Sequence, residues 1–198
     1  MQYFSDIYIG KYIKAPTIST RIKILELSAE LTRKVGFNGF SYLDLAKEIG
    51  VKHAGIHYHF KTKDDLALAL VNSIRERNGA IRAAFEQDLD DPKARLDAMV
   101  EYFASYPKGD KFCMCGMMAA ELASFSPNVR QSLALYFKEF RNWLAVQFSL
   151  LKHPDPQRAA LQFISGLEGS LLIARLEGDA EVVNRAMSRT AAQHTIKL

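Results

Sequence analysis

The sequence contains few cysteines. Only Cys113 and Cys115 occur in 198 residues, and a single residue separates them. Two cysteines so placed do not make the disulfide framework of a small secreted protein, so we expect a reducing, cytoplasmic location. The sequence also lacks an apolar run of membrane-spanning length, and its start lacks a basic stretch followed by an apolar block. We therefore expect neither contact with a membrane nor a signal peptide.

Recognisable motifs of catalysis and metal binding are missing as well. There is no phosphate-cradling glycine loop and no nucleophile elbow, and no motif pairs Cys113 with a histidine. Zinc normally takes four ligands, and neither His153 nor His194 has a recognisable spacing to the cysteine pair. We expect no enzyme activity, no cofactor and no metal. An all-helical thiol enzyme is the alternative, and it would reveal itself by turnover of a substrate.

Alternating β-branched patterns are almost absent, whereas helical apolar patterns fill the chain. A capping residue followed by proline, a typical helix start, recurs at Asp91-Pro92, Ser126-Pro127 and Asp155-Pro156. The sequence therefore predicts an all-α protein of about nine helices, three in a small N-terminal unit and six in a larger domain. Its net charge of +4 permits nucleic-acid binding without demanding it.

Two short helices joined by a tight turn are predicted between Ser41 and Lys63. Ser41 can cap a helix that runs to about Ile49, and Gly50 stands where a helix end needs a left-handed residue. A second helix, from about His53 to Phe60, keeps an apolar side for the core. This spacing is that of a helix-turn-helix, whose second helix enters the major groove of DNA.

The polar side of this region supplies the candidate DNA-binding residues. They are Ser41, Tyr42, Lys52, His53, Ala54, Gly55, His57, Tyr58, His59 and Lys63. A metal site at the three histidines is less favoured, because no acid or cysteine joins them. The alternative function is a helical module whose histidine-rich face docks a partner protein, and competition by duplex DNA would separate the two.

Three segments follow from these signals. Residues 1–16 form an N-terminal extension, residues 17–63 a helix-turn-helix domain, and residues 64–198 a helical domain for effector binding and dimerisation. Thr62, followed three residues later by Asp65, predicts the start of a long linking helix that reaches about Leu89.

The residues of this region resemble a known family. Gly36-Phe37, the string LDLAKEIGV at 43–51 and the string HYHFKTKDDL at 57–66 are similar to the DNA-binding domain of TetR-type bacterial regulators. The close resemblance covers about residues 18–70. It implies a ligand-responsive transcriptional regulator, most often a repressor, that binds double-stranded operator DNA as a homodimer and answers to a small-molecule effector.

Two positions depart from the family pattern. His57 stands where the family usually has an aromatic residue, and Lys52 where it has serine or threonine. The base edges that are read therefore cannot be carried over. The family positions that face DNA match His53, Ala54, Gly55, His57, Tyr58 and His59. We expect Tyr58, His59 and Lys63 to contact phosphates, and Ser41 and Tyr42, at the start of the supporting helix, to meet the DNA backbone.

The segment from Pro156 to Glu177 is apolar around much of its circumference and carries Gly166 and Gly169. Glycine weakens a helix, so these two residues suggest close helix approach. The resemblance implies that this helix and a final helix from Asp179 to about Gln193 form a four-helix bundle with a second copy.

Candidate effector-binding residues centre on the segment Lys111 to Glu121. They are Phe103, Tyr106, Cys113, Cys115, Met118, Phe140 and Trp143. Three interpretations remain open: core filling, a pocket for a small, mostly apolar effector, and a sensor thiol at Cys113 or Cys115. A cysteine at a helix start near Lys108 and Lys111 has reasons for a lowered thiol pKa. Some TetR-like regulators with a cysteine at this helix start answer to electrophiles such as unsaturated carbonyl compounds.

Overall fold

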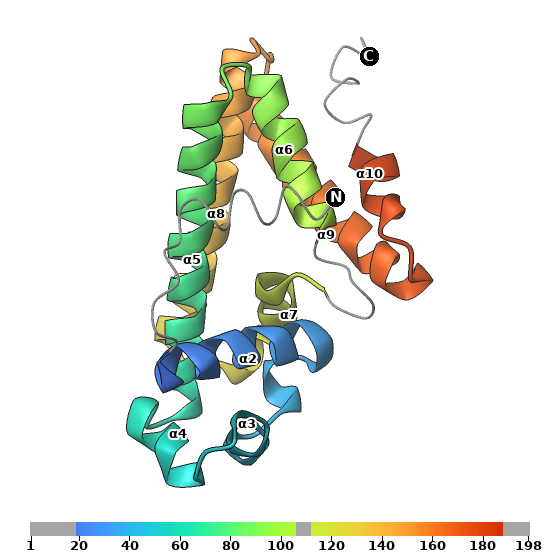
Figure 1. The fold of residues 1–198 in the computed structure, drawn as a ribbon. Coiled ribbons are helices and arrows are strands. Elements are labelled where there is room, and N and C mark those ends of the chain that lie inside the picture. Colours follow the sequence, from blue (N-terminus) through green and yellow to red (C-terminus); the bar gives the residue numbers. More distant parts are fainter. Residues whose placement is uncertain (1–18, 106–111, 188–198) are drawn as a thin grey trace.

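A computed structural model of the chain describes residues 19–105 and 112–187. These residues form nine α-helices and two 3-10 helices without a strand, which confirms the predicted all-α fold (Figure 1). The α-helices are α2 (Thr20–Val35), α3 (Tyr42–Ile49), α4 (His53–His59), α5 (Lys63–Asp88), α6 (Pro92–Ala104), α7 (Met114–Ala120), α8 (Pro127–Leu150), α9 (Pro156–Glu177) and α10 (Glu181–Met187). The 3-10 helices are η1 (Phe37–Gly39) and η2 (Leu122–Ser124). The predicted extension at residues 1–16 and the candidate Tyr106 lie outside the described residues.

Helices α2, α3 and α4 make the small unit at one end of the molecule (Figure 1). Ser41 and Asp44 form a reciprocal capping box at the start of α3, so two backbone N–H groups that the helix cannot satisfy are bonded. Gly50 ends α3 in the left-handed region, with φ 78° and ψ 33°. Ile56 of α4 is fully buried. The predicted helix-turn-helix is confirmed in its caps, its turn and its buried anchor.

Helix α5 leaves this unit and runs the length of the larger domain. A second capping box, made by Thr62 and Asp65, starts it as predicted. Its predicted apolar stripe is buried: Leu66, Leu70, Ile74, Ile81 and Phe85. Because one rigid helix belongs to both parts, a tilt of α5 moves the small unit.

The three proline starts are confirmed as the first residues of α6, α8 and α9. Asp91 accepts a hydrogen bond from the Lys93 amide, and Asp155 accepts one from the Arg158 amide, each at 3.0 Å. Ser126 occupies the cap position of α8 without a side-chain hydrogen bond. The fixed φ of proline therefore suffices for a helix start where the side-chain cap is missing.

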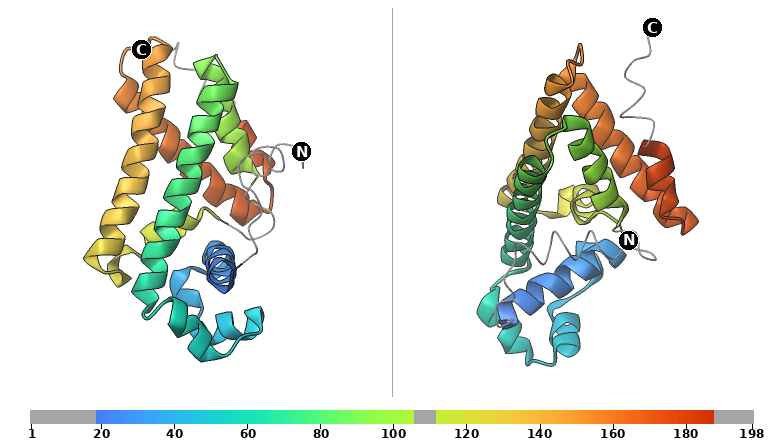
Figure 2. Two further views of the ribbon diagram at one scale, coloured as in Figure 1. Left: turned by 60° about the vertical axis from the view of Figure 1, so that its left-hand side comes forward. Right: turned by 45° about the horizontal axis from the view of Figure 1, so that its top comes forward.

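Helices α5 and α8 lie side by side, and α9 crosses against α8 with α10 on its outer side (Figures 1 and 2). Short α7 fills the space between α2 and α8. It therefore touches both the small unit and the larger domain.

Helix α9 has the predicted bounds, and Gly178 ends it in the left-handed region at φ 68°. Among the described helices it is the one long and apolar enough to meet the composition criterion for a membrane span, yet one of its sides packs in the core. Gly166 and Gly169 are exposed, and open space surrounds the position of a Cβ at Gly169. Gly166 faces α10, where a Cβ would meet the Met187 sulfur at 3.5 Å, whereas no described residue comes within 4 Å of the Cβ position at Gly169.

Candidate DNA-reading surface and effector cavity

The outer face of α4 carries most of the residues predicted to read DNA. Lys52, His53, Ala54, His57 and Tyr58 are exposed, while Gly55 and His59 are half-exposed. The Tyr58 side chain is 84% exposed, which is unusual for a large aromatic residue. We call this set, together with Ser41, the reading face. It presents the Tyr58 hydroxyl, imidazole nitrogens and the Lys52 ammonium, all of which can donate hydrogen bonds to phosphates or base edges.

The histidines of the reading face are held by ring contacts. The His57 ring lies edge-on to those of His53 and Tyr42, with centroid distances of 4.7 and 4.9 Å. Its Nδ1 lies 3.2 Å from the Lys61 carbonyl oxygen. These contacts fix the orientation of the His57 ring in the free protein.

Within the described part of the chain, no group of three or more histidine, cysteine or acidic side chains could hold a metal ion.

Tyr42 differs from the prediction, because its side chain is only 7% exposed. Its hydroxyl donates to the carbonyl oxygen of Thr62. Burial, with a smaller effect from the Asp65 carboxylate, raises the pKa of Tyr42 to about 12. The hydroxyl joins the start of α3 to the start of α5, so this geometry argues against the expected contact with the DNA backbone.

Lys63 is also turned inward. Its Nζ donates to the carbonyl oxygens of Phe37, at 2.7 Å, and Phe40. The ammonium lies over both aromatic rings, 4.6 and 4.1 Å from their centroids. Burial lowers the pKa of Lys63. Lys63 therefore fastens η1 to α5, and we leave it out of the DNA contacts proposed below.

The small unit and the larger domain are joined by a carboxylate that the sequence did not single out. Glu121, at the end of α7, accepts hydrogen bonds from the amides of Phe37, at 2.9 Å, and Asn38, at 3.2 Å. The Asn38 side chain donates to Ser124 at 2.9 Å. A carboxylate bonded to backbone N–H groups makes a strong, directional contact. We call this the Glu121 joint. The sequence hinted at this contact only because Glu121 is the last residue of the segment Lys111 to Glu121.

Two further hydrogen bonds cross the same boundary. The Phe112 amide donates to the Arg33 carbonyl oxygen at 3.0 Å, and Arg175 of α9 donates to the Lys34 carbonyl oxygen at 2.8 Å. They tie the end of α2 to the larger domain on both sides of α7.

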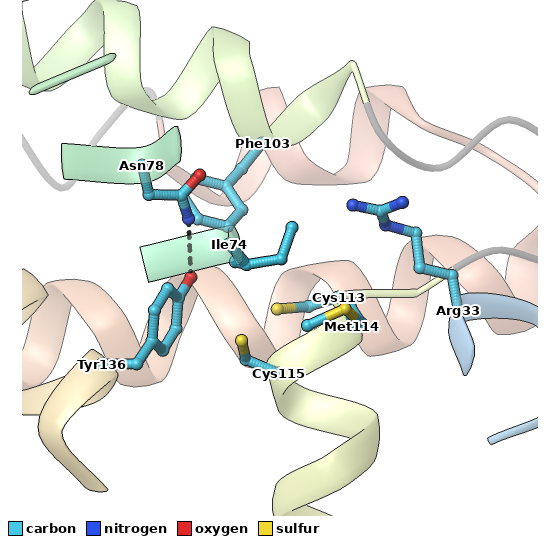
Figure 3. A pocket seen from close by; sticks show the side chains of 8 residues that line it. All are labelled: Arg33, Ile74, Asn78, Phe103, Cys113, Met114, Cys115 and Tyr136. Atoms are coloured by element: carbon cyan, nitrogen blue, oxygen red, sulfur yellow. Dashed lines mark hydrogen bonds between the residues drawn. The ribbon is translucent and has the colours of Figure 1, made fainter. Parts of the chain in front are cut away.

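A cavity lies at the start of α7 (Figure 3). Its lining residues come from α2, α5, α6, α8 and the segment around the cysteines: Arg33, Ile74, Asn78, Phe103, Cys113, Met114, Cys115 and Tyr136. Its volume of about 20 Å³ is enough for about one water molecule. An organic effector can enter only if these side chains move. We call this space the thiol cavity.

The structure sorts the residues predicted to bind an effector. Phe103, Cys113 and Cys115 line the thiol cavity, and Phe140 lies against Phe103 with ring centroids 5.6 Å apart. Met118 is fully buried and does not line that cavity. The Trp143 indole N–H donates to Glu86 at 2.9 Å, an anchor between α8 and α5.

The prediction from the sequence did not include the polar residues that line the thiol cavity. Asn78 donates to the Tyr136 hydroxyl and accepts from the Tyr102 hydroxyl, each at 3.0 Å. Arg33 reaches the cavity from the small unit. No local motif announces such contacts, since they depend on how α2, α5, α6 and α8 pack.

The predicted lowering of the thiol pKa is wrong. Burial raises the pKa of the Cys113 thiol well above its ordinary value, and the nearby Glu168 carboxylate raises it further. Burial and Glu168 also raise the pKa of Cys115, with a smaller opposing effect from Arg33. Cys113 does occupy the helix start, where its sulfur accepts from the Gly116 amide at 3.4 Å. The cost of burying a thiolate exceeds the benefit of that position.

These thiols should resist modification at neutral pH. We expect Ellman's reagent to react slowly with the folded protein and fast after unfolding in urea. Because each thiol keeps its proton longer in the folded state, stability should fall as pH rises above about 8.5, by about 1.4 kcal/mol per pH unit for each thiol. Urea melts at several pH values measure this slope. A Cys113→Ser, Cys115→Ser variant should lack it, and an equally steep slope in that variant would contradict the assignment.

Comparisons with known proteins agree with this arrangement. The family model described as "Bacterial regulatory proteins, tetR family" matches residues 24–70, and "Tetracyclin repressor-like, C-terminal domain" matches residues 92–190. A comparison with curated proteins gives no significant match.

Solved structures share the whole fold. A TetR transcriptional regulator from Legionella pneumophila is 27% identical, with a TM-score of 0.84, over 94% of this chain and 100% of that one. A TetR-family regulator from Agrobacterium tumefaciens is 26% identical, with a TM-score of 0.83, over 88% of this chain and 96% of that one. AibR, solved with isovaleryl coenzyme A and operator DNA, is 21% identical, with a TM-score of 0.67, over 86% of this chain and 97% of its own.

One family model matches the N-terminal helix-turn-helix, and the other matches 99 of the 198 residues, all in the larger domain. The family's members are DNA-binding transcriptional regulators and not enzymes. The chain belongs to the TetR family of ligand-responsive bacterial regulatory proteins.

Proposed function

We propose that this chain is a cytoplasmic repressor, without enzyme activity, that reads its operator with α4 and leaves it when an effector enters the larger domain. The exposed polar and aromatic reading face carries the proposal. Helix α4 has only seven residues, and Ile56 holds it so that this face points outward. Such a helix fits the major groove of DNA.

Within the reading face, the residues have different tasks. Lys52, His53, Ala54, Gly55 and His57 lie along the start and middle of α4 and are proposed to meet base edges. Tyr58 and His59 are proposed to contact phosphates, which fix the register without carrying sequence information. Ser41, at the start of α3, is proposed to meet the DNA backbone. Because Gly55 has no side chain, the backbone of α4 can approach the DNA closely there.

A dimer face is proposed on α8 and α9. Exposed apolar side chains gather on these two neighbouring helices: Leu135, Val146, Leu150, Leu161, Leu172, Ile173 and Leu176. On α9 they share a stripe with exposed Ser165 and Gly169, where a second copy could approach closely. Helix α10 instead buries Val182, Val183 and Met187. The structure thus favours α8, and not the final helix, as the partner of α9 in a four-helix bundle. Two reading helices about 34 Å apart would fit a palindromic operator.

The effector proposed here is a reversible ligand. AibR was solved with an acyl coenzyme A and operator DNA, which is a precedent for a small molecule acting on this fold. The raised thiol pKa values argue against a sensor thiol. An electrophile that released operator DNA from the wild type, but not from the Cys113→Ser, Cys115→Ser variant, would restore that alternative.

The experiment that tests the function is fluorescence anisotropy of the purified protein on its own upstream DNA and on a scrambled duplex. We expect tighter binding to the upstream DNA and a linear fall of log affinity with log salt. Equal affinity for the two duplexes over the whole upstream region would refute an operator there. It would favour the alternative that the reading face docks a partner protein.

Tyr58→Ala should weaken binding to upstream and scrambled DNA alike, by about tenfold, because one phosphate contact is lost. Since the side chain is 84% exposed, the melting temperature should not change. Tyr58→Phe keeps the ring, so it measures the contribution of the hydroxyl to DNA affinity separately. A loss confined to the upstream sequence would mean that Tyr58 reads a base.

A further inference from the structure

A second void, too small to hold a water molecule, adjoins the thiol cavity. Its lining comes from α5, α6 and α8: Asn78, Ile81, Arg82, Met99, Tyr102, Phe103 and Phe140. Asn78 and Phe103 line both spaces, so these two side chains form the wall between them. Figure 3 shows the wall from the side of the thiol cavity. If Phe103 moved, the two voids would join into one elongated site within the larger domain.

The two residues of the wall are held by different kinds of contact. Phe103 stacks on Phe140, with ring centroids 5.6 Å apart, and meets the Tyr102 ring edge-on at 5.4 Å. The stacking contact is apolar, and an apolar ligand could replace it. Asn78 is held between the hydroxyls of Tyr102 and Tyr136 by two hydrogen bonds that do not involve Phe103. Because the second void holds no free volume, room for a ligand would have to come from the space that the Phe103 ring vacates.

The far end of the second void holds a cation that lacks a bonded acid. The Arg82 side chain is half-buried, and its guanidinium forms no hydrogen bond or ion pair with the described residues. The groups that act on its charge are Tyr136, Glu139, Glu86 and Tyr102. The two nearby acids are already engaged. Glu139 pairs with Arg75 at 2.6 Å, and Glu86 accepts the Trp143 indole N–H. Burial lowers the pKa of Arg82, a sign that the cation is short of solvent as well.

The opposite end of the joined site is lined by a second cation, Arg33, and the Glu168 carboxylate lies close to it without being part of the lining. Glu168 lies beside Cys113, and its Oε2 is buried without a hydrogen-bond partner. Arg33 and Glu168 act in opposite directions on the Cys115 thiol, so the positive charge at that end is offset. An anionic group therefore finds net attraction at Arg82 and an apolar or neutral group fits better toward Cys113.

We infer that the effector is a small organic acid whose carboxylate pairs with Arg82 and whose apolar part replaces Phe103 against Phe140. A guanidinium presents donors that match a carboxylate in two parallel hydrogen bonds. The inference rests on the proposed effector-responsive function and names the chemistry of its ligand.

The test compares acids with their neutral amides on the full-length protein. Straight-chain carboxylates from acetate to dodecanoate, with benzoate and phenylacetate, are each titrated beside the matching primary amide by calorimetry. At least one acid should bind about tenfold or more tightly than its amide. Arg82→Gln should remove this difference, Arg82→Lys should keep part of it, and Arg141→Gln, at an exposed arginine of α8, should leave it unchanged.

The acid-to-amide ratio of the wild-type protein needs no variant, so it stands even if an Arg82 variant fails to fold. Equal binding of acid and amide, an unchanged ratio in folded Arg82→Gln, or no binding of any acid would overturn the inference. Operator binding is measured in the same preparation. Failure of the acids with operator binding intact overturns only the ligand chemistry, whereas loss of operator binding refutes the proposed function itself.

Discussion

Gly55→Trp should abolish specific operator binding while the protein stays folded. Gly55 is half-exposed in the middle of the reading face. An indole there would project toward the groove and hold α4 away from the bases, so we expect affinity to fall by about a hundredfold or more, toward the non-specific level. Anisotropy on operator DNA measures the loss, and thermal unfolding checks the fold.

Gly55→Ala is the matched control. A Cβ at Gly55 would meet only the Val51 side chain, at 3.8 Å, which is ordinary van der Waals contact. Alanine also favours a helix by about 1 kcal/mol relative to glycine, so this variant should be at least as stable as the wild type. If Gly55→Trp bound the operator like Gly55→Ala, α4 would not be the helix that enters the groove.

Gly36→Ala should destabilise the protein by about 2–4 kcal/mol, since it combines backbone strain with disruption of the Glu121 joint. Gly36 has φ 85° and ψ 161°, a region open almost only to glycine. A Cβ would lie 2.2 Å from Glu121 Oε1. The carboxylate is the end of a flexible side chain, yet its other oxygen is bonded to two amides, so it cannot withdraw without losing them. Urea melts measure the change.

Two variants separate strain from disruption. Gly50 also has positive φ, 78°, in the left-handed region, and nothing lies within 4 Å of the position that a Cβ would take there. Gly50→Ala therefore measures backbone strain without a clash and gives a lower limit for the strain at Gly36. Adding Glu121→Ala to Gly36→Ala removes the clash, and the double variant should be more stable than the sum of the single changes predicts. A Gly36→Ala effect no larger than that of Gly50→Ala would show that Glu121 moves aside freely.

Local signals in the sequence predicted the helices well. Ser41 with Asp44, Thr62 with Asp65, and the aspartate-proline pairs act within a few residues of their own helix starts. Their effect depends little on the rest of the fold, because the backbone groups that they satisfy are adjacent in the chain. The bounds of α9 could therefore be predicted to the residue.

The placement of charged and reactive groups could not be predicted in this way. Lys63 was predicted to contact a phosphate, but in the structure its ammonium binds the carbonyl oxygens of Phe37 and Phe40 and lies over their rings. Cys113 does start a helix, but its burial beside Glu168 reverses the expected shift of its pKa. Both outcomes depend on residues far away in the chain, which a single sequence does not place.

The domain boundaries, residues 17–63 and 64–198, stay a prediction. The family models leave residues 71–91 between them, and these belong largely to α5. Because α5 runs without a break from the small unit into the larger domain, no linker marks a boundary in the described part of the fold.

The contacts that hold the small unit have a consequence for how such a regulator can diversify. Four hydrogen bonds end on its main chain, at the carbonyl oxygens of Arg33 and Lys34 and the amides of Phe37 and Asn38. Every residue type except proline offers these same groups. Substitutions on the reading face can therefore accumulate without loosening the attachment of the small unit. New operator preferences can arise by mutation of the reading face while the response to the effector is inherited unchanged.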